Sequence, residues 1–251
     1  MTTLSEIVAF LDRELKISEI PDYAGALNGL QLENGGEVYR VVVAVDASLP
    51  VVKKAIAANA QLLLVHHGMF WQGAQTVTGA FYRKLKMAID AGLAIYSAHL
   101  PLDVHPQWGN NACLARALGL SEIKPFMDWK GLAIGLQGEM NRTRDDLVKL
   151  VERAVGGSVH FCPAGPDRIR KIGIVTGGAG SQVAEAAQAG VDTFVTGEGP
   201  HWSYSLAEEL GINLIYGGHY ATETFGVQAV ARVLKERFDL DWEFVDHPTG
   251  L

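Results

Sequence analysis

The first half of the chain alternates between helix-like and strand-like hydrophobic patterns. Apolar side chains from Leu4 to Leu15 recur at the spacing of one helix face, which predicts an amphipathic helix over residues 5–16. Apolar runs that are bounded by turn residues then alternate with further helical segments. The predicted strands are residues 38–45, 62–65 and 93–97, and the predicted helices are residues 50–59, 80–91 and 110–118. This alternation is typical of parallel βαβ units.

The second half repeats the alternation. The predicted strands are residues 132–137, 159–162, 172–176, 192–196 and 213–216. The predicted helices are residues 144–155, 182–189, 205–210 and 224–237, the first of them opened by Thr143. The fold class is therefore α/β throughout.

The two halves also resemble each other in sequence. Residues 95–103 and 215–223 both read Ile-Tyr-small-small-His-x-x-x-acid, at an offset of about 120 residues. Residues 45–46 and 175–176 match at predicted strand ends, and residues 114–118 match 230–234. We therefore predict two α/β domains of related topology, an internal pseudo-repeat. Residues 1–126 form the first domain, on which residues 225–251 pack back, and residues 127–224 form the second.

Composition supports a packed globular chain. The 251 residues contain 48% apolar and 20% charged residues, and about 150 residues per domain gives about 1.7 domains. The net charge of −7, without a long Lys/Arg block, argues against nucleic acid and anionic membranes as partners. Cys113 and Cys162 form no disulfide framework. The N-terminus has no basic region, and apolar runs are too short for a membrane span, so we expect a cytoplasmic protein.

Histidines and carboxylates follow three of the predicted strands. His66-His67 follow residues 62–65, His99 and Asp103 follow 93–97, and His219 and Glu223 follow 213–216. In parallel α/β sheets, functional groups collect beyond the carboxyl ends of the strands. His66, His67, His219, Asp103 and Glu223 thus form a candidate ligand set, with His99 nearby. Mixed nitrogen and oxygen ligands suit Zn, Mn, Fe, Co or Ni, and the lack of a thiolate disfavours a structural zinc site.

The spacing of these residues favours two ions. Adjacent side chains diverge in extended backbone, so His66 and His67 suit two neighbouring ions better than one. His219 and Glu223 are four residues apart at a predicted helix start and can face one point. Pro101 predicts a loop instead of a helix between His99 and Asp103. Taken singly, each pattern is also typical of hydrogen-bonded histidines at a strand end or of chance spacing. Two ions that share a carboxylate activate water, which implies hydrolysis.

These residues carry a family resemblance. His66-His67-Gly68, the run His99 to Asp103 and Gly217-Gly218-His219-x-x-x-Glu223, with an early Asn28-Gly29-Leu30-Gln31, resemble the Nif-three-like dinuclear-metal family. Its members are often named GTP cyclohydrolase 1 type 2 homologs. The similarity spans nearly the whole chain, in the short form without an inserted domain.

The resemblance implies a fold, an assembly and roles for single residues. It implies a toroidal homohexamer and a dinuclear metal site in the cleft between two α/β domains. His67 and Asp103 would bind one ion, His66 and His219 the other, and Glu223 would bridge them. His99 would stand close by as a catalytic acid or base.

The function that follows is a dinuclear-metal hydrolase of a small nucleotide-like or heterocyclic substrate. A GTP cyclohydrolase-like reaction would open the guanine ring by hydrolysis, through a hydroxide that bridges the metals. The alternative is a non-enzymatic metal-binding or regulatory scaffold that acts through its oligomer. A nucleotide-binding loop at residues 176–181 is a third hypothesis, but a tight βα turn explains that segment better because the third glycine of the dinucleotide motif is missing.

Weaker signals have simpler explanations. Glu198 is expected to line the same cleft without being a ligand, and His105 and Trp108 to shape its mouth. His160, His201 and His247 are expected to be ordinary polar residues. Residues 145–153 are expected to form a solvated helix face with i,i+4 charge pairs.

Overall fold

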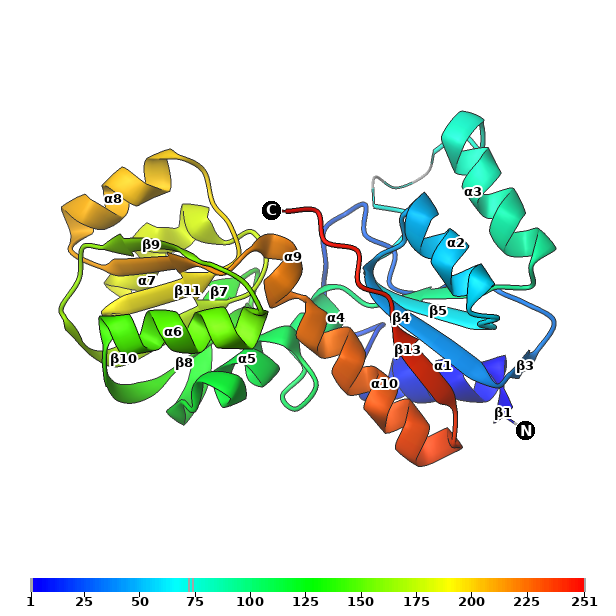
Figure 1. The fold of residues 1–251 in the computed structure, drawn as a ribbon, viewed down its shortest axis with the longest axis horizontal. Helices are drawn as coiled ribbons and strands as arrows, with labels where there is room; N and C mark the ends of the chain where they lie inside the picture. Colours follow the sequence, from blue (N-terminus) through cyan, green and yellow to red (C-terminus); the bar gives the residue numbers. More distant parts are fainter. Residues whose placement is uncertain (1, 72, 74, 251) are drawn as a thin grey trace. The chain divides into compact units, whose positions relative to one another are not determined.

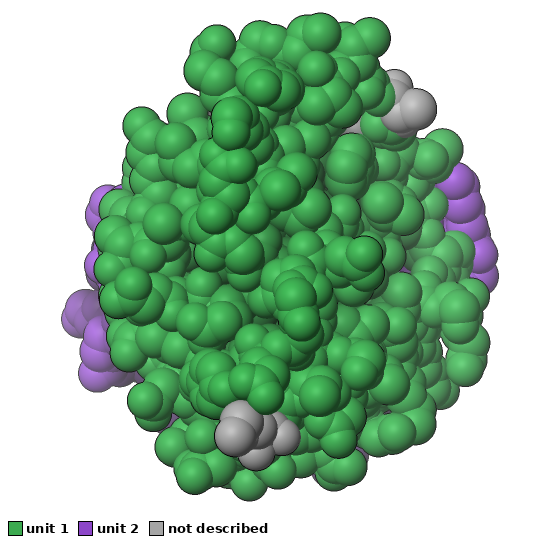
Figure 2. Space-filling view, turned by 90° about the vertical axis from the view of Figure 1, so that its right-hand side faces the viewer, with its two compact units in different colours: residues 1–102, 226–247 green, residues 103–225, 248–251 purple. Residues whose placement is uncertain are grey.

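The computed structural model describes residues 2–71, 73 and 75–250. It has a mixed α/β fold and divides into two compact units, whose elements are labelled in Figure 1 and whose surfaces are coloured in Figure 2. Unit 1 comprises residues 1–102 and 226–247, and unit 2 comprises residues 103–225 and 248–251. Each unit contains a sheet of five or six strands, and this confirms the predicted α/β class.

Unit 1 is built around a five-stranded sheet in the order β13-β4-β5-β6-β2. The first four strands run parallel, and β2 pairs antiparallel with β6 at the edge. Two helices connect the central strands. The elements are β2 (Gly29–Leu32), β4 (Arg40–Asp46), α2 (Leu49–Ala57), β5 (Leu62–His67), α3 (Gly79–Asp90), β6 (Ala94–Ser97) and β13 (Asp241–Phe244). The short strands β1 (Thr2–Thr3) and β3 (Glu37–Val38) form a separate ladder.

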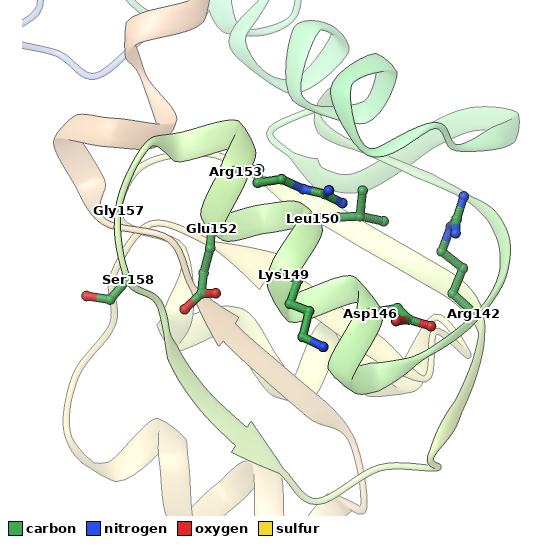
Figure 3. Close-up of a pocket in the computed structure, with 8 residues that line it drawn as sticks. All are labelled: Arg142, Asp146, Lys149, Leu150, Glu152, Arg153, Gly157 and Ser158. Atoms are coloured by element: carbon green, nitrogen blue, oxygen red, sulfur yellow. The ribbon is translucent and has the colours of Figure 1, made fainter.

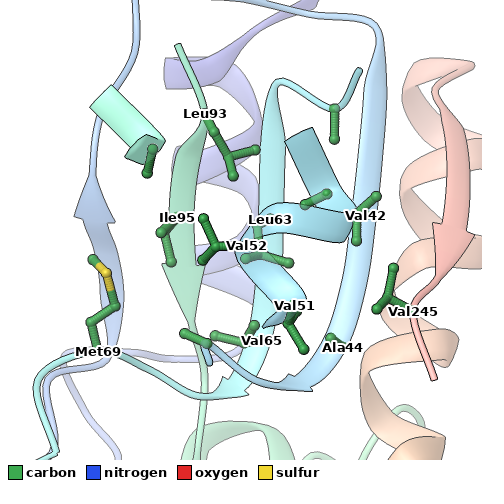
Figure 4. Packing of buried hydrophobic residues seen from close by; sticks show 14 residues of the cluster. Val42, Ala44, Val51, Val52, Leu63, Val65, Met69, Leu93, Ile95 and Val245 are labelled. Atoms are coloured by element: carbon green, nitrogen blue, oxygen red, sulfur yellow. The ribbon is translucent and has the colours of Figure 1, made fainter. Parts of the chain in front are cut away.

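Both faces of this sheet are buried because helices cover both. Val42, Leu63 and Ile95 point to one face, where they form a cluster with Val51 and Val52 of α2 (Figure 4). The alternate strand residues, such as Val43 and Leu64, are equally buried and point to the opposite face. Helices α1 (Leu4–Glu14) and α10 (Thr224–Phe238) lie on that opposite side (Figure 1). Burial of both faces explains the nearly continuous apolar runs of β4 and β5.

Unit 2 contains a six-stranded sheet in the order β7-β8-β10-β11-β12-β9. Strands β10, β11 and β12 are parallel, and β8 and β9 pair antiparallel with β10 and β12. The strands are β7 (Ser121–Trp129), β8 (Leu132–Thr143), β9 (His160–Pro163), β10 (Arg168–Val175), β11 (Thr193–Thr196) and β12 (Asn213–Tyr216). The helices are α5 (Asn110–Leu118), α6 (Arg144–Val155), η1 (Gly180–Gln182), α7 (Val183–Gln188), α8 (Trp202–Leu210) and α9 (His219–Thr222).

The core of unit 2 has two layers. Ile174, Val195 and Ile215 pack in one cluster with residues of α5 and α6. Phe194 and Leu214, the neighbours of the last two along their strands, pack in another cluster with residues of α7 and α8. The period of two along each strand therefore distributes side chains between two helical layers.

The sheets of the two units have part of their topology in common, and they differ at the other edge, where β13 pairs parallel with β4 but β8 pairs antiparallel with β10. In each, three parallel strands follow one another along the chain with helices between them: β4, β5, β6 in unit 1 and β10, β11, β12 in unit 2. In each, a strand that precedes these three in the sequence, β2 or β9, pairs antiparallel with the last of them.

The boundary between the units differs from the predicted boundary at residue 126. Helix α5 packs through Leu114 and Leu118 against residues of unit 2, and β7 pairs with β8. Residues 103–126 therefore belong with unit 2, because side-chain packing and strand pairing, which local pattern does not record, place them there. Residues 226–247 return to unit 1.

The prediction of a loop between His99 and Asp103 is wrong. Leu100–Asp103 form the short helix α4, with Pro101 in its first turn. A proline in the first turn costs no hydrogen bond because its missing N–H would have no partner within the helix.

Candidate functional site

Three histidines lie together in unit 1. His66 and His67 end β5, and His99 follows β6, the neighbouring parallel strand. The ring centroids of His66 and His67 are 4.7 Å apart, and that of His99 lies 5.0 and 5.6 Å from them. Each ring offers one nitrogen within 4.8 Å of the others, a spacing at which they could hold a metal ion. The strand ends thus bring together three of the predicted site residues.

The Nδ1 atom of each of these rings is held by an oxygen. His66 Nδ1 lies 2.9 Å from the Ala98 carbonyl, His67 Nδ1 2.9 Å from Asp46 Oδ1, and His99 Nδ1 2.9 Å from Asp22 Oδ1. Carbonyl and carboxylate oxygens accept, so we assign the ring proton to Nδ1 in each case. The lone pair then lies on Nε2, which is the arrangement that metal-binding histidines usually have.

Asp22 is the most extensively bonded of these oxygen partners. Its side chain is 6% exposed and accepts from His99, from Asn28 Nδ2 at 2.8 Å, and from the backbone N–H groups of Tyr23 and Leu100. Burial opposes its charge, but the hydrogen bond and electrostatic interaction with His99, together with the bonds from Asn28 and Tyr23, outweigh burial and lower the pKa of Asp22. Asn28 Oδ1 also accepts from the His99 backbone N–H at 2.7 Å. His99 is thereby fixed at both side chain and backbone.

Two of the other predicted ligands meet in unit 2. His219 begins α9 two glycines after the end of β12, and Glu223 follows the end of that helix. His219 Nε2 lies 3.2 Å from Glu223 Oε2, and His219 Nδ1 lies 2.9 Å from Glu198 Oε1. The bond to Glu223 is the main cause that raises the pKa of His219 to about 9, against a smaller opposing effect of burial; Glu198 adds to the rise. Glu223 is itself 3% exposed, so this carboxylate is held away from solvent.

Asp103 also belongs to unit 2 and is buried. Its Oδ1 atom accepts from Asn110 Nδ2 at 2.8 Å, and its carbonyl accepts from Asn111 Nδ2 at 3.2 Å. Asn111 Oδ1 in turn accepts from the Thr176 backbone N–H at the end of β10. Asp103 is thus fixed by the first turn of α5, in a different unit from the three histidines that precede it.

The glycines after β10 make room for the ligands of unit 2. Gly177 has a φ of +72°, and a Cβ atom there would lie 2.3 Å from Glu223 Oε1. The Gly177 carbonyl accepts from the backbone N–H groups of Gly197 and Glu198. These contacts support the interpretation of residues 176–181 as a tight βα turn, whose glycine lets Glu223 approach the backbone.

Two partners of the histidines were not predicted from the sequence, namely Asp22 and Asp46. Asp46 carries a signal, since it ends β4 at the position that pairs with His67 on β5. Asp22 lies outside any helix or strand, 77 residues from His99, and no pattern marks it. Glu198 was predicted to line the site and contacts His219 directly.

A pocket of about 760 Å³ in unit 2 is not a candidate site. It is lined mainly by charged side chains of α6 and its flanks, including Arg142, Lys149 and Arg153 (Figure 3). The close-up shows Lys149 and Arg153 on α6 and Arg142 at the end of β8, with side chains that point in different directions and do not converge on one point. This agrees with the expected solvated helix face.

Elsewhere in unit 2, His105 and Trp108 stack at 4.3 Å between ring centroids. His105 lines a pocket of about 270 Å³ together with Asp103.

Comparison with known proteins shows that nearly the whole chain is similar to one protein family. The family model for Duf34/NIF3 (NGG1p interacting factor 3) matches residues 2–249. The chain belongs to the Duf34/NIF3 family.

Relatives in this family match over at least 94% of their own length. A protein of Deinococcus radiodurans named GTP cyclohydrolase 1 type 2 homolog is 40% identical over 98% of this chain and 94% of its own. A namesake from Pyrococcus horikoshii is 42% identical over 98% of both chains. Among solved structures, a protein from Thermus thermophilus has a TM-score of 0.89, with 37% identity and complete coverage of both chains. Protein ybgI, described as of unknown function, has a TM-score of 0.92 and 33% identity, also with complete coverage.

The Duf34/NIF3 chain shows no helix, within its described residues, that is long and apolar enough to cross a bilayer.

Proposed function

We propose that this protein is a metal-dependent hydrolase that binds two divalent ions through His66, His67, Asp103, His219 and Glu223. One observation carries the proposal: the Nδ1 atoms of His66, His67 and His219 are each held by a carboxylate or carbonyl oxygen, so that Nε2 is the ring nitrogen that would bind metal. In His219 this atom lies 3.2 Å from Oε2 of Glu223, another proposed ligand. The name that the relatives carry, GTP cyclohydrolase 1 type 2 homolog, supports a hydrolytic reaction on a nucleotide-like or heterocyclic substrate.

The donor set fits a divalent transition ion. It combines neutral imidazoles with carboxylates and includes no thiolate, which suits Zn, Mn, Fe, Co or Ni. Within unit 1, the two histidine ligands, His66 and His67, each offer a nitrogen within 4.8 Å of the other. Bound ions of this kind lower the pKa of water and polarise substrate oxygens. Hydrolysis is proposed to require the ligands of both units.

His99 is proposed to act as the catalytic acid or base. Its Nδ1–H donates to Asp22, so Nε2 can take a proton from water or return one to a leaving nitrogen. The buried Asp22 carboxylate stabilises the charged imidazole that forms when Nε2 takes a proton. Ring-opening hydrolysis of a guanine-type base needs such a proton donor at the ring nitrogen that leaves.

Metal content and turnover test the proposal together. We expect two divalent ions per chain by inductively coupled plasma mass spectrometry, and hydrolysis of members of a nucleotide panel that includes GTP. Glu223→Ala should abolish turnover and reduce the metal content, whereas the control Glu208→Ala, on the exposed face of α8, should keep both. A metal-free preparation with full activity would refute the metal-dependent mechanism. Stoichiometric metal binding without turnover on any substrate would instead support the scaffold function.

The assembly proposed from the resemblance is a toroidal homohexamer in the cytoplasm, with a small-molecule substrate and neither nucleic acid nor membrane as partner. Analytical ultracentrifugation tests this directly, because a hexamer of the 27.1 kDa chain sediments far from a monomer or dimer. A monomer at micromolar concentration would contradict it.

A further inference from the structure

Unit 2 contains a second pocket, of about 620 Å³, that the proposed ligand set does not use. It lies at the carboxyl ends of β11 and β12 and is lined by the rings of His160, His201, Tyr204 and Tyr216, with Glu198 and the glycines beside it. Its volume is typical of small-molecule sites. In open α/β sheets this end of the strands is where ligands bind.

Three of these rings lie side by side and form an aromatic wall. His160 begins β9 and lies directly opposite Tyr216, the last residue of β12, in the antiparallel register. Their centroids are 6.1 Å apart and their planes differ by 16°. Tyr204 of α8 adds a third ring, 5.5 Å from His160. The Tyr216 hydroxyl pairs with the Ser203 hydroxyl, so this ring is anchored at its polar end.

Glu198 places a carboxylate beside this wall. Its Oε1 atom accepts from His219, but the side chain is 43% exposed and also lines the pocket. Its second oxygen can therefore accept from a ligand. None of the described residues that line the pocket is a lysine or arginine. A phosphate group would meet a negative charge here, whereas a ring edge with N–H donors would meet an acceptor.

We propose that this pocket binds a planar heterocycle that carries adjacent N–H donors, as the Watson–Crick edge of guanine does. The aromatic wall takes the ring face and Glu198 accepts from the ring edge. This inference rests on the proposed function, because it names the substrate class of that hydrolase and the place where the ring of the substrate is held. Because Glu198 also holds His219, one carboxylate joins the ring pocket to a proposed metal ligand.

Binding to metal-free protein tests this inference apart from hydrolysis. Guanosine is titrated into chelator-treated protein in a calorimeter, with adenosine as the comparison because it lacks the adjacent N–H pair of guanine. Guanosine should bind about tenfold more tightly than adenosine, the effect of one hydrogen bond to a charged acceptor. Glu198→Gln should remove most of this preference and retain ring binding.

Variants of the wall identify the location. Tyr204→Leu keeps an apolar side chain but removes the ring, and should weaken guanosine binding about tenfold. His160→Gln, at an exposed position, provides a second test should Tyr204→Leu fail to fold. The control is Tyr82→Leu, which removes an exposed tyrosine of unit 1.

The outcomes separate the two proposals. No guanosine binding, or equal binding by the wall variants and the control, would overturn the ring pocket and leave the metal-dependent reaction standing. Binding that is lost in the wall variants would support the pocket even if no hydrolysis were found.

Discussion

Gly177→Ala is predicted to disrupt the ligands of unit 2 through a single added methyl group. The backbone at Gly177 has a φ of +72°, a left-handed conformation that costs alanine about 1–2 kcal/mol. The new Cβ would lie 2.3 Å from Glu223 Oε1, closer than such atoms approach in proteins. Because Glu223 is 3% exposed and contacts His219 through its other oxygen, a shift of its carboxylate to admit the methyl group should disturb that contact.

The magnitude follows from these two effects. Backbone strain of about 1–2 kcal/mol adds to about 1–3 kcal/mol for the disturbed buried carboxylate, so the free energy of unfolding should fall by about 2–5 kcal/mol. Metal affinity should fall at least about tenfold, as it does when the support of a metal ligand is lost.

The neighbouring glycine supplies a matched control. A Cβ at Gly178 would lie 3.5 Å from its nearest contact, His219 Nδ1, which is an ordinary distance, and its φ is not left-handed. Gly178→Ala should therefore be neutral or stabilise the protein by up to about 1 kcal/mol through the unfolded chain. Urea unfolding of metal-free protein and competition with a chelating dye measure both quantities. Equal metal affinity of the two variants would refute the close approach of Glu223 to residue 177.

Three further predictions address the other supports of the site. Asp22→Ala removes the acceptor of four hydrogen bonds and should lower the free energy of unfolding in urea by about 3 kcal/mol. The control Asp90→Ala, at an exposed position, should lower it by less than about 0.5 kcal/mol. Protonated His219, whose pKa is raised to about 9, should stabilise the metal-free protein. This stabilisation should be complete below pH 6.5 and should be lost as the pH rises through 9. In unfolding experiments at a series of pH values, His219→Gln should not show this loss. Zinc at about 100 times its Kd should raise the free energy of unfolding by about 2.7 kcal/mol. A chelator should reverse this rise, and thermal unfolding with and without the chelator measures it.

Helices with strong local signals were predicted almost to the residue. Helix α6 begins after Thr143, whose hydroxyl accepts from the Asp146 N–H, and ends before Gly156 in the left-handed conformation. Both signals are local, since a cap and a terminating glycine act within one turn of the helix. Helix α5 also has the predicted bounds and likewise ends at a left-handed glycine, Gly119, although its N-cap, Gly109, has no side chain that could cap it.

Edge strands were missed because their own side chains carry little pattern. Strand β7 is mostly exposed, and it forms by backbone pairing with β8 across a tight turn. Strand β13 has four residues and exists through parallel pairing with β4, about 200 residues earlier in the chain. Such strands depend on a partner that the local sequence does not contain.

The sequence by itself determined the α/β alternation, the internal repeat and the presence of histidines and carboxylates at strand ends, because these are matters of periodicity and residue type. Only the tertiary structure decided how those side chains are held. His99 receives its acceptor from a residue 77 positions away, and His67 and His219 receive theirs from residues 21 positions away on neighbouring strands or strand ends. A carboxylate can accept from an imidazole only when the fold brings the two within about 3 Å, and that distance is a property of strand order and loop path.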